Sequence, residues 1–273
     1  MKKIVASLIL FYSFSFPVWA NSCLPELSAQ EQQTLILLSD TSTIGDIYDV
    51  QYRMSQISEI LGESADPRGT FPVVYSVMTD QAVWSVSQGT YDDLNMASDL
   101  LIEFASRYLA NYHAYLVNEP VEHHWIHYFD LAEDCKNSPL RLAASGINSH
   151  ITIDLAASVE AIGAPKSFKN DFDLYGEVLV EKSDVINEKL LEYYGVDGSE
   201  FFSGFFVGEW VDKFLGTGAT TEFAFSTVRT QAWINGRLLQ HWLTRGATLV
   251  AMNVSFHNRE LILMDLQRLG LLD

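Results

Sequence analysis

Apolar residues recur at three- and four-residue spacing along most of this chain, and this periodicity is the feature that most limits its fold. The clearest case is the segment 92–116, where one helix face carries Ala97, Leu101, Phe104, Tyr108 and Tyr112. No segment alternates between apolar and polar residues over the length of a strand. The chain is therefore predicted to be all-α.

Residues typical of helix ends divide this pattern into segments. Ser28 and Glu31 form a capping box, Ser138 and Pro139 begin a helix that runs to about Ile162, and Gly195 ends the helical pattern over 170–194. Further helical patterns cover 44–61, 72–86, 120–132, 201–215, 222–243 and 254–269. We expect one domain over residues 21–273, a bundle of roughly nine or ten helices.

The first twenty residues are typical of a secretory signal peptide. Lys2 and Lys3 precede an apolar run, Pro17 follows it, and cleavage is expected after Ala20. This predicts export to the periplasm or out of the cell. No other segment approaches the roughly twenty apolar residues of a membrane span. Without the two lysines, 15 basic and 35 acidic residues remain, a net charge of −20 that disfavours nucleic acid and anionic membranes as partners.

The chain has two cysteines, Cys23 and Cys135, and both follow the predicted cleavage site. An even number of cysteines in an exported chain indicates a disulfide. We predict that Cys23 and Cys135 form one, which would tie the start of the mature chain to its middle.

His150 and Asp154 are the candidate functional pair. They stand four residues apart in an apolar helical segment, so they share a helix face, and Asp154 can orient the imidazole or both side chains can bind a metal. Burial makes such a pair costly unless other groups join it. The candidates to do so are acidic or basic residues on other helices, and a second histidine group, His123, His124 and His127, ranks below the pair.

Several residues complete the predicted site. We predict catalytic roles for His150, Asp154 and Arg229, ligand contacts for Asn148, Glu103 and Trp233, and a divalent metal (zinc, iron or manganese) held by His150, Asp154 and Asp99. The alternative for each is structural: a His-x-x-x-Asp pair can be a satisfied hydrogen bond, and Glu103 with Arg107 a salt bridge along a helix.

Four segments resemble an uncharacterised bacterial helical family, a domain of unknown function. They are Phe71 to Thr79, Phe104 to Tyr108, Gly146 to Leu155 and Arg229 to Trp233, within a match of about 72–239. The most specific is Asn-x-His-Ile-x-x-Asp-Leu, in which Ser149 replaces the alanine usual in the family. The resemblance implies that Asn148, His150, Asp154 and Arg229 belong to one centre, and it implies no reaction.

Two functions agree with these patterns. The first is a metal-dependent hydrolase, in which the metal activates water and Arg229 stabilises the developing anion on a small-molecule substrate. The second is a helical binding or structural protein, in which the same residues form a buried polar network beside an aromatic pocket.

Overall fold

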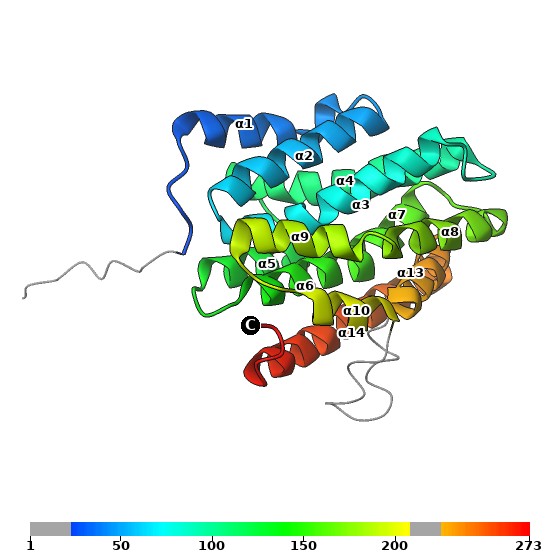
Figure 1. Ribbon diagram of the computed structural model, residues 1–273. Coiled ribbons are helices and arrows are strands. Elements are labelled where there is room, and N and C mark those ends of the chain that lie inside the picture. The colour runs from blue at the N-terminus through cyan, green and yellow to red at the C-terminus, as the bar shows by residue number, and fades with distance from the viewer. Residues whose placement is uncertain (1–22, 208–224) are drawn as a thin grey trace, which may run out of the picture.

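Helices form the regular structure of residues 23–207 and 225–273, the part of the chain that this computed structural model describes. They are α1 (Ala29–Ser39), α2 (Ile47–Glu63), α3 (Thr70–Ser87), α4 (Leu94–Leu116), α5 (His123–Glu133), α6 (Pro139–Ser149), α7 (Leu155–Ala161), α8 (Lys169–Val180), α9 (Ser183–Tyr194), α10 (Ser199–Val207), α13 (Phe225–Leu239) and α14 (Trp242–Arg268). The two described ranges contain no strand, which confirms the predicted all-α class (Figure 1).

Local capping explains where several helices begin and end. The Ser28 hydroxyl accepts from the backbone N–H of Glu31 at 3.2 Å and the Glu31 carboxylate accepts from that of Ser28 at 2.7 Å, which confirms the capping box. The Ser138 hydroxyl likewise accepts from the N–H of Arg141, with Pro139 in the first turn of α6. Gly195 ends α9 in the left-handed region at φ 69°.

Two helix boundaries differ from the predicted pattern. The segment 170–194 is two helices, α8 and α9, and α14 begins at Trp242 rather than near 254. Tertiary hydrogen bonds account for the break before α14, because the side-chain amide of Gln240 donates to the carbonyls of Val159 and Ala164 at 3.2 Å each. The predicted helices at 201–215 and 222–243 extend into 208–224, which lies outside the described residues.

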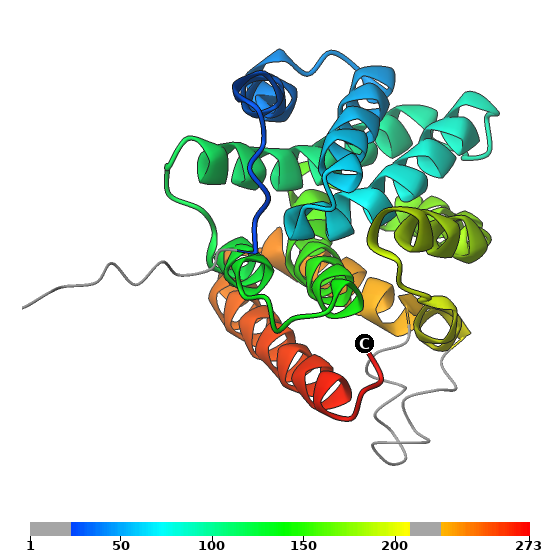
Figure 2. The same cartoon turned by 60° about the vertical axis from the view of Figure 1, so that its left-hand side comes forward.

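One continuous helical segment passes through the middle of the molecule. It consists of α6, a π-helical turn η3 (His150–Asp154) and α7. Helices α3, α4 and α5 contact this segment on one side and α13 and α14 on the other (Figures 1 and 2). Gly146 permits the close approach of α3, since a Cβ atom there would lie 2.5 Å from the Cβ of Phe71. The central segment is therefore covered on both sides.

The hydrophobic core is one contiguous cluster that reaches from Leu27 to Leu272. Among the described helices, none combines the length and the apolar character that crossing a bilayer requires. The predicted signal peptide, residues 1–20, lies outside the described residues.

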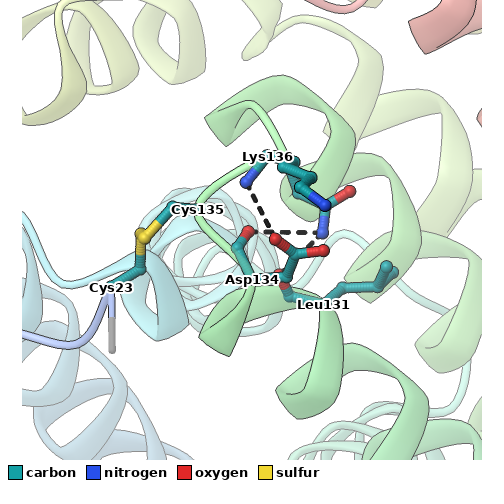
Figure 3. The surroundings of a disulfide bond; sticks show 6 residues. Cys23, Leu131, Asp134, Cys135 and Lys136 are labelled. Atoms are coloured by element: carbon teal, nitrogen blue, oxygen red, sulfur yellow. Dashed lines mark hydrogen bonds between the residues drawn. A yellow bond between two sulfur atoms is a disulfide. The ribbon is translucent and has the colours of Figure 1, made fainter. Parts of the chain in front are cut away.

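The predicted disulfide joins Cys23, before α1, to Cys135, just after α5 (Figure 3). The two Cα atoms are 5.1 Å apart and the bond closes a loop with a sequence separation of 112. Asp134 orders the loop beside it, because its carboxylate accepts from the backbone N–H of Lys136 at 3.1 Å. The bond thus ties the N-terminal segment to α5.

Replacing Cys23 and Cys135 with serine should lower the free energy of unfolding by about 2–4 kcal/mol, because the bond limits the conformations of a long loop in the unfolded chain. Urea denaturation of the oxidised protein and of the double variant measures this. Reduced wild-type protein is the control and should match the variant. Equal stability of oxidised and reduced wild-type protein would contradict the prediction.

Candidate functional site

The carboxylate of Asp154 is the centre of the candidate site. It is 1% exposed and accepts three ring N–H groups, each at 2.9 Å: His124 Nε2 on Oδ1, and both Trp125 Nε1 and His150 Nδ1 on Oδ2. Burial opposes ionisation, but the positive character of His124 and the hydrogen bonds from both histidines outweigh it and hold the pKa of Asp154 well below its usual value. Asp154 is therefore ionised at neutral pH.

Two elements bring these groups together. His124 and Trp125 lie in the first turn of α5, whereas His150 and Asp154 are the first and last residues of the π-helical turn. In that turn the backbone N–H of Leu155 bonds to the carbonyl of His150, five residues back. Such turns occur frequently at functional sites. The Ser149 hydroxyl donates to the carbonyl of His124 at 3.1 Å and fastens α5 to α6 beside the cluster.

The hydrogen bond to Asp154 sets the tautomer of His150. An ionised carboxylate only accepts, so Nδ1 carries the proton and Nε2 carries a lone pair. Nε2 is buried and has no hydrogen-bond partner within residues 23–207 and 225–273. Burial lowers the pKa of His150 in spite of the nearby Asp154 carboxylate, and the ring is neutral at pH 7. The site thus contains a fixed imidazole with an unused basic nitrogen.

Aromatic rings hold the His150 imidazole in place. The ring of Phe104 stacks on it with centroids 3.6 Å apart and an interplanar angle of 12°. Tyr75 and Phe71 meet it edge to face at 4.4 and 5.3 Å. The ring orientation is therefore set on one side by Asp154 and on the other by packing.

A cavity of about 50 Å³ adjoins the imidazole. Its walls are Phe71, Val74, Tyr75, Met78, Phe104, Ile147, His150, Ile151, Phe225 and Arg229. A second cavity of about 40 Å³ shares Tyr75, Met78, Phe104 and Arg229 with the first. Apart from His150 and Arg229 the walls are largely apolar, so these two side chains are the ones placed to bind a polar group or to take part in a reaction.

The structure brings together only some of the residues predicted for the site. His150 and Asp154 are hydrogen-bonded, and Arg229 lines the same cavity as His150. Trp233 packs against Phe172, with ring centroids 5.0 Å apart. It lines neither cavity.

Two acidic residues predicted for the site lie outside the cluster. Glu103 forms a half-buried ion pair with Arg107 at 2.6 Å, four residues along α4. Asp99 is exposed on α4. The geometry therefore does not bring Asp99 to His150 and Asp154 as a third metal ligand.

Asn148 belongs to a different buried network. Its side-chain amide donates to Glu260 Oε1 at 2.8 Å, and Glu260 also accepts from Arg141 Nη2 at 2.6 Å and from Ser145 Oγ at 3.1 Å. Positions two apart in a helix face nearly opposite ways, which separates Asn148 from His150. The single centre that the resemblance implied is thus divided between two faces of the central helix.

Sequence reasoning missed the other partners of Asp154. The sequence predicted His123, His124 and His127 as a separate histidine group, but His124 and Trp125 are the residues that bond Asp154, and His127 bonds Glu260 at 2.9 Å. One feature of the sequence could have pointed to them: His124 and Trp125 are adjacent in an apolar helical pattern, and each carries a ring N–H donor.

The residues best placed to hold a metal ion are Glu122, His124 and Asp154. Within the described ranges they are the one group of three such residues whose ligand atoms all lie within 4.8 Å of one another. Nitrogen with two carboxylate oxygens suits zinc, iron or manganese. A metal there would replace the proton that His124 now shares with Asp154, and Glu122, whose side chain is 58% exposed, would have to close over it.

Replacing Asp154 with asparagine should lower the free energy of unfolding at pH 7 by about 2–4 kcal/mol, because the amide cannot satisfy three N–H donors. A carboxylate whose pKa is lowered by folding stabilises the fold above its unfolded pKa of about 3.9 and loses that effect as the pH falls below it. The difference between wild type and Asp154→Asn should therefore shrink below about pH 4. Urea denaturation followed by tryptophan fluorescence tests both points, and an unchanged difference at low pH would contradict them.

Comparison with known proteins gives one match. No curated protein and no solved structure matches the chain. The model of a family of unknown function, DUF5995, matches residues 47–258, a region that contains all the residues of the site. This range covers well over half of the chain, and the protein belongs to the DUF5995 family.

Proposed function

We propose that this protein is a hydrolase in which His150 is the general base. The observation that carries the proposal is the buried Nε2 atom of His150, which has no hydrogen-bond partner among the described residues although Asp154 and Phe104 fix the ring. An unsatisfied buried acceptor costs about 1–3 kcal/mol, and such groups call for a functional explanation. A reacting water or substrate hydroxyl would supply the missing donor.

The chemistry follows from the protonation states of the site. Neutral His150 takes a proton on Nε2 from water as the water oxygen attacks a carbonyl carbon, and the Asp154 carboxylate stabilises the imidazolium that forms. His150 then returns the proton to the leaving group. Arg229, on the wall of the same cavity, can stabilise negative charge on the substrate. The reaction would take place after export, where the Cys23–Cys135 disulfide is stable.

Replacing His150 with glutamine should reduce hydrolysis at least about a hundredfold, since general-base catalysis contributes typically 10²–10⁴-fold. The assay uses a panel of small p-nitrophenyl and amide substrates with purified full-length protein. His113→Gln is the matched control, because His113 bonds Ser39 and the Ile36 carbonyl, apart from the Asp154 cluster. Equal rates for wild type and His150→Gln would contradict the proposal.

A metal-dependent hydrolase is the second candidate, and the grouping of Glu122, His124 and Asp154 supports it. In this case a metal ion would lower the pKa of a bound water, and His150 would act beside it. Both Asp154 and His124 would then be metal ligands, in place of the predicted ligands His150, Asp154 and Asp99.

Metal analysis separates the two hydrolases. The metal-dependent enzyme should contain about one zinc, iron or manganese ion per chain when purified without an affinity tag, and Glu122→Gln should weaken its retention at least about tenfold. Glu119→Gln is the control, since Glu119 has no place in the cluster. Metal-free protein that hydrolyses substrate supports the His150 base alone. Metal-free and inactive protein favours a structural or binding role for the network.

A further inference from the structure

Arg229 is a buried cation that no carboxylate of the described residues pairs with. It is 7% exposed, and across the described residues it has no ion pair and one hydrogen bond, from Nη2 to the carbonyl of Phe172 at 2.7 Å. Asp173 is the carboxylate whose charge acts on it, but that side chain pairs with Lys169. Burial lowers the pKa of Arg229 to about 10, so the guanidinium is still charged at pH 7.

The described surroundings of Arg229 hold the cation in place and do not supply a counter-charge. The guanidinium carbon lies 4.6 Å from the centroid of the Phe172 ring and 5.5 Å from that of Phe225. Gly176 makes room for it, because a Cβ atom there would lie 2.5 Å from Arg229 Nε. Ring faces and one carbonyl offset only part of the cost of burying a charge.

The unbalanced charge adjoins the two cavities. Arg229 is the charged residue among the walls of both, while His150 lines one of them. A guanidinium presents donors in a planar fork that matches a carboxylate. An anion bound here would both balance the cation and lie next to the imidazole.

The size and walls of the cavities select the kind of anion. Their volumes, about 50 and 40 Å³, together hold roughly three water-sized groups. Phe71, Val74, Met78, Ile147 and Ile151 supply apolar surface and no donors. A phosphate or sulfate dianion needs more donors than these walls offer, whereas a short monocarboxylate needs one fork and an apolar pocket for its chain.

We propose that the cavities beside Arg229 bind a short-chain monocarboxylate, with its carboxylate on the guanidinium and its alkyl chain against the aromatic and aliphatic walls. The proposal names the ligand class of the site. It rests on the proposed function only where it takes the acid to be part of the substrate or a product of hydrolysis. Ester hydrolysis releases one carboxylic acid, so the product would have the charge and size that this site recognises.

The test compares formate and acetate with formamide and acetamide, which have nearly the same shapes and no charge. Titration calorimetry of wild-type protein at constant ionic strength should show saturable binding of the carboxylates, at least about tenfold tighter than of the amides. Equal affinity for the acid and the amide, or no binding of either, would overturn the proposal.

Two variants locate the binding. Arg229→Met keeps an apolar side chain against the two rings and should weaken carboxylate binding at least about tenfold, while Arg229→Lys should retain part of it. If Arg229→Met does not fold, Gly176→Ala displaces the guanidinium without removing its charge and should weaken the same binding. Unchanged affinity in Arg229→Met, or in Gly176→Ala when it is the variant used, would overturn the proposal.

Failure of this proposal and failure of the proposed function give different results. Carboxylate binding by wild-type protein that hydrolyses none of the substrates refutes the hydrolase and supports the ligand class. Hydrolysis that depends on His150 while wild-type protein shows no preference for carboxylates over amides refutes the ligand class and leaves the hydrolase standing.

Discussion

The buried carboxylate of Asp154 is the interaction on which the centre of this fold depends. An ionised carboxylate without solvent is strongly unfavourable unless hydrogen bonds compensate it, and here three ring N–H groups do so. Two of the donors come from α5 and one from the π-helical turn, so the compensation also fixes how α5 lies against the central helix. The same bonds assign the tautomer of His150. The hydrogen bonds to Asp154 therefore both stabilise this part of the fold and set the tautomer on which any chemistry at His150 depends.

Glu260 forms a second buried carboxylate centre on the other side of the central helix. It accepts from Arg141, Ser145 and Asn148 and bonds His127. Burial raises its pKa, but the hydrogen bond with His127, the charge of Arg141 and the hydrogen bond from Asn148 outweigh this and hold the pKa at about 2. This centre attaches α14 to α6. The two differ in their surroundings. Glu260 is matched by a full cation, Arg141, and lines neither of the two cavities beside Arg229, whereas His150 lines one of them and its Nε2 atom has no hydrogen-bond partner in the described part of the chain.

Local patterns predicted the helices well because caps and periodicity act over a few residues. Ser28 with Glu31, Ser138 with Pro139, and Gly195 each mark a helix end where the structure has one. The pairing of His150 with Asp154 was also predictable, since four residues span one helical turn. The partners from α5 were not, because His124 lies 30 residues from Asp154 in sequence and only packing decides which histidine of the run faces it. The π-helical turn likewise has no marker in the sequence.

Asn148 shows why a shared motif need not mean a shared site. It stands two residues before His150, and that spacing turns it toward α14 and Glu260. Its carbonyl oxygen accepts from Thr152, to which Arg259 also donates, so the motif links two polar networks through one helix. Arg229, far along the chain, is closer in function to His150 than Asn148 is, because both line one cavity. The motif Asn-x-His-Ile-x-x-Asp therefore combines a structural anchor, Asn148, with a candidate reactive centre, and of these motif side chains His150 is the one with a buried polar atom that no described residue satisfies.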